Sequence, residues 1–250
     1  MSTPPLNHRL ALRERPTGQS VVMYQRWRDL LFLHWEINPV EIQKTLPPGL
    51  FVDTFANRAY LGLVPFFMCD IRPRFCPAVP GLSNFLEVNV RTYVYDERGV
   101  AGVWFYSLDA NQWLAVKMAR LFFKLPYFYA KMAAKKETNG AVAYTTWRRN
   151  STPALSSRFH YRGQGLRRQA EPGSLEFFLV ERYILFAVPG RDQLATGQVY
   201  HPPYPLSEAE VIQWDSHLLT LAGFASPGQA PDHILYSPGV DVDVYALQKC

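Results

Sequence analysis

Cysteine is scarce in this sequence, which has Cys69, Cys76 and Cys250 among its 250 residues. An odd and low count does not provide the disulfide framework of a small secreted protein. No histidine or second cysteine pair completes a zinc pattern beside them. The segment 1–20 has no apolar core of the signal-peptide type. We therefore expect reduced thiols, a cytoplasmic protein and a loose N-terminal segment over 1–20.

Apolar runs of membrane-spanning length are also missing, since no stretch approaches the roughly 20 residues that such a helix needs. The net charge is +5, yet no run of five or six basic residues suggests a nucleic-acid-binding tail. We expect neither a membrane nor a nucleic acid as partner. One feature weakly favours nucleic-acid binding, which needs an exposed basic stripe. It is a set of arginines from which such a stripe is built if they share a surface: Arg148, Arg149, Arg158, Arg162, Arg167 and Arg168.

Motifs for metals, cofactors and nucleophiles are absent as well. The six histidines show no H-x-x-x-H or H-E-x-x-H spacing, and no G-x-G-x-x-G loop, Walker-type loop or G-x-S-x-G elbow occurs. We expect no metal and no cofactor. A metal site assembled only by the fold stays open, because distant histidines can still meet in space.

Aromatic residues are abundant by contrast, at 14% within a hydrophobic content of 48%. This composition is typical of a globular protein and excludes a disordered chain. The 20 prolines and 15 glycines are spread along the sequence, which favours short strands and turns over a helical bundle. No repeat or low-complexity linker divides the chain. We expect a single domain over 21–250.

Most of the expected elements are strands. Apolar and alternating stretches predict them over 50–55, 59–71, 85–95, 101–108, 141–149, 157–162, 183–188, 208–214, 234–236 and 240–247. Short helices are expected over 39–46, 110–123, 175–180 and 217–222. This order predicts a β-rich α+β domain, with an antiparallel β-barrel or cone and few short helices.

Residues 85–95 alternate cleanly between two faces. One face is plain core, with Leu86, Val88, Val90, Thr92 and Val94. The other face is polar in its middle and aromatic around it, with Phe85, Glu87, Asn89, Arg91, Tyr93 and Tyr95. The wall of a barrel lumen or cleft has this character. Alternation does not say which face is wet, so a lumen and a solvent face both stay open.

The helix expected over 110–123 follows the next strand. Asp109 and Gln112 resemble a capping box at its start. Its expected core stripe consists of Leu114, Met118, Leu121 and Phe122, and a second face carries Trp113, Lys117, Arg120 and Lys124. A strand–hairpin–strand–helix unit can bring Arg120 close to Glu87. The two side chains then form either a bracing ion pair or a cleft that holds a ligand carboxylate.

Several strings of residues carry a family resemblance. They are LPPGL at 46–50, AYLGLVPF at 59–66, FLEVNVRTYV at 85–94 and GVWFYSLD at 102–109. FLVERY at 178–183, HPPYPL at 201–206 and YSPGVDV at 236–242 fit as well. On these strings the chain resembles, over 25–247, the bacterial family DUF2071, which includes YqjF-like proteins. The resemblance implies little about function, because the family lacks an assigned activity.

A more distant resemblance is to acetoacetate decarboxylase-like proteins. Phe85-x-Glu87 fits their aromatic-x-Glu element, and Arg120 falls where their Gly-Arg-Glu lies. The resemblance implies a cone-shaped β-barrel with a buried site. Tyr127 and Phe128 replace the paired lysines, and neither can form the imine of the decarboxylase mechanism.

Acetoacetate decarboxylase activity itself is therefore not expected. Lys135 and Lys136 lie further along the chain in a polar stretch, where we interpret them as a solvated pair. Lys131 is a weaker candidate for an inward-pointing amine.

We predict a small-molecule pocket protein for an acidic ligand, a carboxylate or oxo-acid. If the protein is an enzyme, it is lyase-like or hydrolase-like, with Glu87 as proton shuttle, Arg120 as holder of a carboxylate or oxyanion, and Tyr127 as donor. The expected ligand-binding residues are Phe85, Asn89, Arg91, Tyr93, Trp104 and Tyr106. The alternatives are a non-catalytic binding protein and a filled barrel with a structural or partner-binding role. A homo-oligomer stays open.

Overall fold

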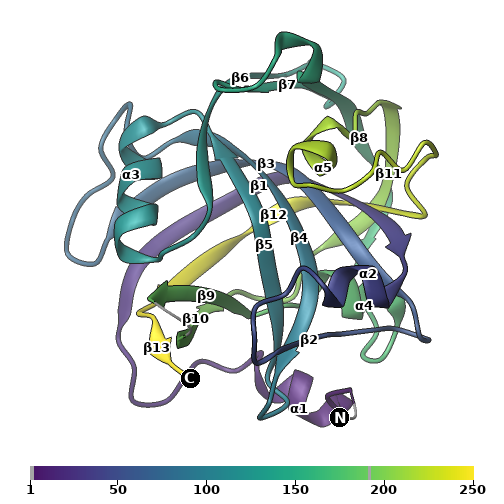
Figure 1. Cartoon of the computed structure of the whole chain (residues 1–250). Coiled ribbons are helices and arrows are strands. Elements are labelled where there is room, and N and C mark those ends of the chain that lie inside the picture. The colour runs from purple at the N-terminus through teal and green to yellow at the C-terminus, as the bar shows by residue number, and fades with distance from the viewer. Residues whose placement is uncertain (1–2, 191–192) are drawn as a thin grey trace.

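Five long strands form the centre of the fold in the computed structural model, which describes residues 3–190 and 193–250. They are β1 (Val21–Ile37), β3 (Ala59–Pro73), β4 (Phe85–Asp96), β5 (Ala101–Ala110) and β12 (His233–Tyr245). They pair antiparallel in the order β12-β1-β3-β4-β5 (Figure 1). The short strand β2 (Leu50–Val52) pairs with the end of β4.

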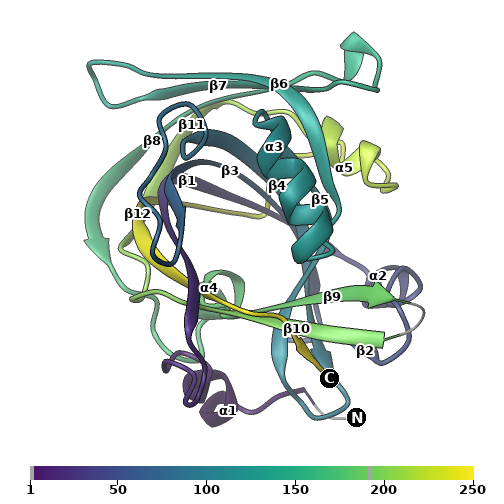
Figure 2. The same cartoon turned by 90° about the vertical axis from the view of Figure 1, so that its left-hand side faces the viewer.

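Two further groups of strands join β5 to β12 and close two rings that share the five central strands. One group is β9 (Ile184–Gly190) and β10 (Gln193–Tyr200), with β13 (Gln248–Lys249) at its edge. The other is β6 (Tyr127–Lys136), β7 (Val142–Arg148), β8 (Ser157–Arg168) and β11 (Leu206–Gln213). In Figure 2, β6 and β7 lie at the top, and β9 and β10 cross the lower half of the picture above α1.

The two faces of β4 point into different rings. Every residue of β4 is buried. Leu86, Val88 and Val90 pack with Tyr144 and Phe159, in the core of the ring that contains β6, β7, β8 and β11. The opposite, polar face of β4 looks into the ring closed by β9 and β10. The polar face is therefore a lumen and not a solvent face.

The helices are short: α1 (Leu6–Ala11), α2 (Pro39–Gln43), α3 (Trp113–Phe122), α4 (Leu175–Val180), α5 (His217–Leu221) and one 3-10 turn (Pro153–Leu155). The segment expected to be loose contains α1. Arg9 of α1 forms an ion pair of 2.6 Å with the buried carboxylate of Asp53. This pair ties the N-terminal segment to the barrel.

Helix α3 differs from its expectation in both start and packing. Its N-cap is Gln112, whose side chain accepts a hydrogen bond from the backbone of Leu114 at 3.1 Å. The predicted cap, Asp109, lies in β5 instead. The predicted core stripe is wrong, because Leu114, Met118, Leu121 and Phe122 are exposed and the buried residue is Val116. Leu114, Met118 and Phe122 border the hollow interior of the barrel, so no other side chains cover them.

Four of the described strands were not predicted: β1, β6, β10 and the two-residue β13. The sequence of β6, YFYAKMAAKK, is rich in alanine and lysine, which favour strands weakly. Its pairing with β5 on one side and β7 on the other decides its conformation. Lys131 is exposed and lies over the ring of Trp147, so it does not point inward. Lys136 is not merely solvated, because its Nζ lies 2.7 Å from Asp29 Oδ1.

The expected fold class is confirmed: a single β-rich α+β domain built around a barrel, with few short helices. Two pairings depart from an all-antiparallel barrel, since β5 pairs in parallel with both β6 and β9. Among the described residues, no helix is long and apolar enough to cross a membrane.

Candidate functional site

A cavity of about 820 Å³ occupies the ring closed by β9 and β10. This volume is typical of a site for a small organic molecule. Side chains from β1, β3, β5 and α3 make most of its wall apolar, among them Met23, Trp27, Leu30, Val64, Phe66, Met68, Phe105, Leu108, Met118 and Phe122. The lumen is hollow, which disfavours the alternative of a filled barrel.

A small set of polar side chains reaches the cavity. Glu87, Asn89 and Arg91 come from alternate positions of β4, and Tyr127 comes from the start of β6. Gly62 of β3 lies directly opposite Arg91. A Cβ atom at Gly62 would fall 3.2 Å from Arg91 Cγ, so the glycine leaves room for the arginine side chain.

Glu87 and Tyr127 form a buried hydrogen-bonded pair. Tyr127 Oη donates to Glu87 Oε2 at 2.8 Å, and the Asn89 side chain donates a second hydrogen bond. Burial raises the pKa of Glu87 to about 7, although both hydrogen bonds oppose this shift. Burial also holds the pKa of Tyr127 well above its usual value. At neutral pH Glu87 can therefore release or take up a proton, while Tyr127 stays a neutral donor.

Arg91 is a buried cation whose bonding is incomplete. Its side chain makes one long hydrogen bond, 3.4 Å from Nη2 to the carbonyl oxygen of Leu179, and its Nε has no partner among the described residues. Arg91 is 9% exposed and takes part in no ion pair of the described part of the chain. Asn89 Oδ1, on the same strand face, also has no hydrogen-bond partner in the described part of the chain. A buried cation is costly without an anion, so this geometry suits an anionic ligand.

A second arginine in the cavity wall is already paired. Arg182 Nη1 lies 2.8 Å from Asp53 Oδ2, and Asp53 also holds Arg9. Burial lowers the pKa of Arg182 to about 10, so its guanidinium stays charged at neutral pH. The single carboxylate of Asp53 thus pairs with the guanidinium groups of both Arg9 and Arg182. Arg91 lies in the same cavity wall as Arg182. This part of the lumen carries surplus positive charge.

The structure brings together only part of the predicted set. Glu87, Asn89, Arg91, Phe85 and Tyr127 line the cavity. The remaining four predicted residues, Tyr93, Trp104, Tyr106 and Arg120, are not part of its wall.

A bulge explains the misplaced aromatic residues of β5. The pairing of β4 with β5 shifts register between Val90 and Arg91, so that Arg91 lies opposite Phe105. Phe105 therefore faces the lumen in place of its neighbours Trp104 and Tyr106. Tyr106 bonds outward to the hydroxyl of Thr45 at 2.6 Å. Bulges carry no strong sequence signal, and simple alternation missed this one.

Arg120 does not pair with Glu87 in the structure. It is exposed, and its Nε donates to the backbone oxygen of Tyr127 at 2.6 Å. The buried ion pair of this region joins Asp109 of β5 to Arg148 of β7, through contacts of 2.6 and 2.9 Å. Asp109 is therefore a buried partner of an arginine and not a helix cap.

No group of three or more His, Cys, Asp or Glu within residues 3–190 and 193–250 is arranged to hold a metal ion. Burial, together with the positive charges of Arg13 and Arg91, lowers the pKa of His201 to about 4. Burial likewise holds the pKa of His34 well below its usual value. These two imidazoles are neutral near pH 7 and add no charge to the lumen.

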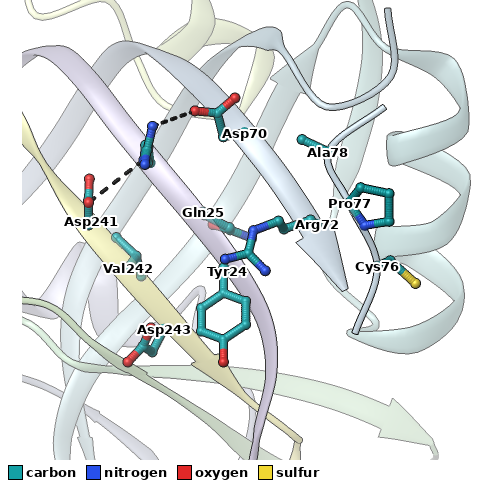
Figure 3. A pocket seen from close by; sticks show the side chains of 11 residues that line it. Tyr24, Gln25, Asp70, Arg72, Cys76, Pro77, Ala78, Asp241, Val242 and Asp243 are labelled. Carbon is teal, nitrogen blue, oxygen red and sulfur yellow. Dashed lines mark hydrogen bonds and ion pairs between the residues drawn. The ribbon is translucent and has the colours of Figure 1, made fainter. Parts of the chain in front are cut away.

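A second hollow of about 420 Å³ lies on the outer surface, where β1, β3 and β12 run side by side (Figure 3). Arg26 lies 2.7 Å from Asp70 and 3.7 Å from Asp241, the two ion pairs dashed in Figure 3. The guanidinium of Arg72 lies over the ring of Tyr24. The charged groups of Arg26, Asp70 and Asp241 are exposed and already paired, so the inner cavity is the better candidate site.

Comparison with known proteins agrees with this fold. Residues 24–241 match the family DUF2071, described as an uncharacterized conserved protein. The uncharacterized protein YqjF of Bacillus subtilis is 39% identical over 231 residues, which cover 91% of this chain and 92% of YqjF.

Two solved structures share the architecture at low identity. Acetoacetate decarboxylase from Legionella pneumophila superposes with a TM-score of 0.63 at 12% identity, covering 95% of this chain and 90% of its own. The enduracididine biosynthesis enzyme MppR complexed with pyruvate superposes with a TM-score of 0.59 at 11% sequence identity. The match covers 93% of this chain and 91% of the MppR chain. The chain belongs to the DUF2071 family, and its fold is that of the acetoacetate decarboxylase-like proteins.

Proposed function

We propose that this protein binds a small organic carboxylate or oxo-acid in the cavity, with Arg91 holding the carboxylate. The observation that carries the proposal is the buried Arg91 guanidinium, which has an unbonded Nε and no anionic partner among the described residues. A planar guanidinium matches a carboxylate through two parallel hydrogen bonds. The unpartnered Asn89 Oδ1 accepts a hydrogen bond from a hydroxyl or protonated group of the same ligand.

The rest of the cavity supports a ligand with an apolar body. Trp27, Phe66 and Phe105 are among the side chains that surround the polar groups. A carboxylate with a short aliphatic or aromatic substituent fits a wall of this character. The complex of MppR with pyruvate supports the same ligand class on a similar fold.

The chemistry that the site supports is proton transfer. Glu87, with its pKa near 7, passes a proton to or from a carbon or oxygen of the bound acid, while Tyr127 donates a hydrogen bond. No lysine is found among the described residues that line the cavity, so the proposal contains no imine. Glu87 and Tyr127 therefore keep the roles predicted for them, and Arg91 replaces Arg120 as the anion holder.

A non-catalytic binding protein is the second candidate, favoured by the largely apolar wall. The variant Glu87→Gln separates the two functions. If Glu87 moves a proton, wild type turns over the ligand, whereas Glu87→Gln only binds it. If the protein is not an enzyme, wild type and Glu87→Gln both bind the ligand and neither turns it over. For either function we propose a cytoplasmic location, supported by the free thiols of Cys69, Cys76 and Cys250.

A thermal-shift screen tests the proposal. Wild type, Arg91→Met and Arg120→Ala are heated with a panel of oxo-acids, hydroxy-acids and aliphatic and aromatic acids, each beside its primary amide. We expect at least one acid to raise the melting temperature of wild type by several degrees, because a ligand that binds only the folded state stabilises it. Arg91→Met is expected to lose this response, and Arg120→Ala, altered outside the cavity, to keep it.

The unliganded proteins supply a control for a purely structural role. Arg91 is a buried cation without an anion, so Arg91→Met is expected to melt at the same temperature as wild type or higher. Two results would refute the proposal: no acid stabilises wild type, or Arg91→Met responds to the acids as wild type does.

A further inference from the structure

The cavity reaches the surface between α3 and the loop that joins β3 to β4. Met118 and Phe122 of α3, and Val79 and Leu82 of the loop, line the cavity and are also exposed to solvent. Figure 2 shows α3 and this loop on opposite sides of the open end of the barrel. Gln112 links the two, since its Nε2 donates to the carbonyl oxygen of Gly81 at 2.7 Å. We call residues 74–84 and 111–124 the mouth surface.

The mouth surface exposes a large amount of apolar area. Phe75 is 89% exposed, and Leu121 and Phe122 are 59% and 58% exposed. Helix α3 buries Val116 and lines the cavity with Met118 and Phe122, whereas Trp113 and Leu121 lie outside the cavity wall and are exposed. Clustered apolar side chains of this kind mark an interaction surface, whereas single exposed ones do not.

Two exposed side chains of the mouth surface stand at left-handed backbone positions. Phe75 has φ of 68° and Lys124 has φ of 53°, the left-handed region that bulky residues avoid. Lys124 follows the C-cap of α3, where glycine is the usual residue. Asparagine and glycine adopt this backbone conformation at a lower energetic cost. An aromatic ring and a cation occupy them instead, and both side chains are exposed.

The charge of the mouth surface has one sign. Arg74, Lys117, Arg120 and Lys124 are exposed, and neither of the two segments contains an Asp or Glu. The cations lie beside the exposed rings: Lys117 Nζ is 4.7 Å from the centre of the Trp113 ring, and Arg74 lies 4.8 Å from that of Phe75. Aromatic rings with neighbouring Lys and Arg are typical of segments that rest in the interface of a bilayer.

We propose that the mouth surface docks on an anionic lipid bilayer. The exposed rings and leucines enter the interface, while the four cations meet the lipid phosphates. A second copy of this chain fits less well, because a symmetric contact would bring cation against cation. Peripheral docking needs no membrane-spanning segment. It also brings the open, apolar cavity close to the bilayer surface.

Vesicle co-sedimentation of the full chain tests the docking. We expect the protein to sediment with vesicles of equal parts phosphatidylglycerol and phosphatidylcholine at low salt. It should stay in solution with phosphatidylcholine alone, and high salt should release it. Phe75→Asn and Leu121→Gln alter residues outside the cavity wall and are each expected to weaken binding by about tenfold. Lys124→Gly is expected to weaken it while raising the melting temperature.

The controls separate docking from ligand binding. Leu166→Gln removes a side chain that is 94% exposed on β8, outside the mouth surface, and should sediment as wild type does. Arg91→Met should keep vesicle binding even though it loses its response to acids. Docking is refuted if wild type stays in solution with anionic vesicles, or if Phe75→Asn and Leu121→Gln bind as wild type does. It is equally refuted if wild type is a dimer that these two variants dissociate, because the surface then joins two copies.

Discussion

Replacing Arg148 with methionine is expected to lower the free energy of unfolding by about 3–5 kcal/mol. Arg148 and Asp109 form a bidentate pair, with side chains that are 9% and 0% exposed. Burial raises the pKa of Asp109, and Arg148 opposes that shift. Without the arginine, Asp109 must stay buried as an uncompensated charge or take up a proton. Urea denaturation at pH 7, followed by circular dichroism, measures the loss.

Two comparison variants show whether burial causes this effect. Arg58→Met breaks an exposed pair with Glu36 and is expected to have a far smaller effect on the free energy of unfolding, because solvent screens the pair. The double variant Asp109→Asn/Arg148→Met removes both charges and should recover much of the stability that Arg148→Met loses. A loss for Arg148→Met no larger than that for Arg58→Met would contradict the buried pair.

The stability advantage of Glu87→Gln over wild type is expected to grow by about 3 kcal/mol between pH 4 and pH 8. Burial raises the pKa of Glu87 from 4.5 to about 7. Below pH 4.5 the carboxyl is neutral in both the folded and the unfolded state, so its pKa shift has no effect on stability. Between pH 4.5 and 7 the unfolded chain releases the proton first, and the folded state loses stability as the pH rises. The difference in pKa corresponds to about 3 kcal/mol.

Urea denaturation of both proteins at four or five pH values measures this difference. Glutamine keeps the shape of the side chain but cannot ionise, so it isolates the carboxyl group. Tyr127→Phe is a second probe, because it removes a donor that lowers the pKa of Glu87 in the folded state. The fall in stability should still begin near pH 4.5, but it should extend to a higher pH and become larger. A stability difference between wild type and Glu87→Gln that does not change with pH would show that Glu87 is not buried as described.

Much of the candidate site follows from one sequence pattern. The alternation of 85–95 placed Phe85, Glu87, Asn89 and Arg91 on one face, and the structure puts all four in the cavity wall. Strand geometry makes this step safe, because successive side chains point to opposite sides. The pattern could not say that Arg91, rather than Arg120, is the cation in the lumen. That depends on where α3 packs.

The failures of prediction share a physical cause, which is tertiary context. Helix α3 has apolar residues on two faces, and the sequence does not tell which face the barrel covers. The bulge in β5 puts Phe105, in place of Tyr106, opposite Arg91 and into the cavity wall. Asp109 has the spacing of a helix cap, but the partner that decides its role, Arg148, lies 39 residues away.

The most direct test of the central claim is a calorimetric titration with one apolar carboxylic acid and its primary amide. The two ligands share their shape and differ in charge, so the comparison isolates the contact with Arg91. We expect wild type to bind the acid about 10- to 100-fold more tightly than the amide, and Arg91→Met to lose that preference. Equal affinity of wild type for the acid and the amide would contradict the claim that the buried guanidinium of Arg91 holds a carboxylate.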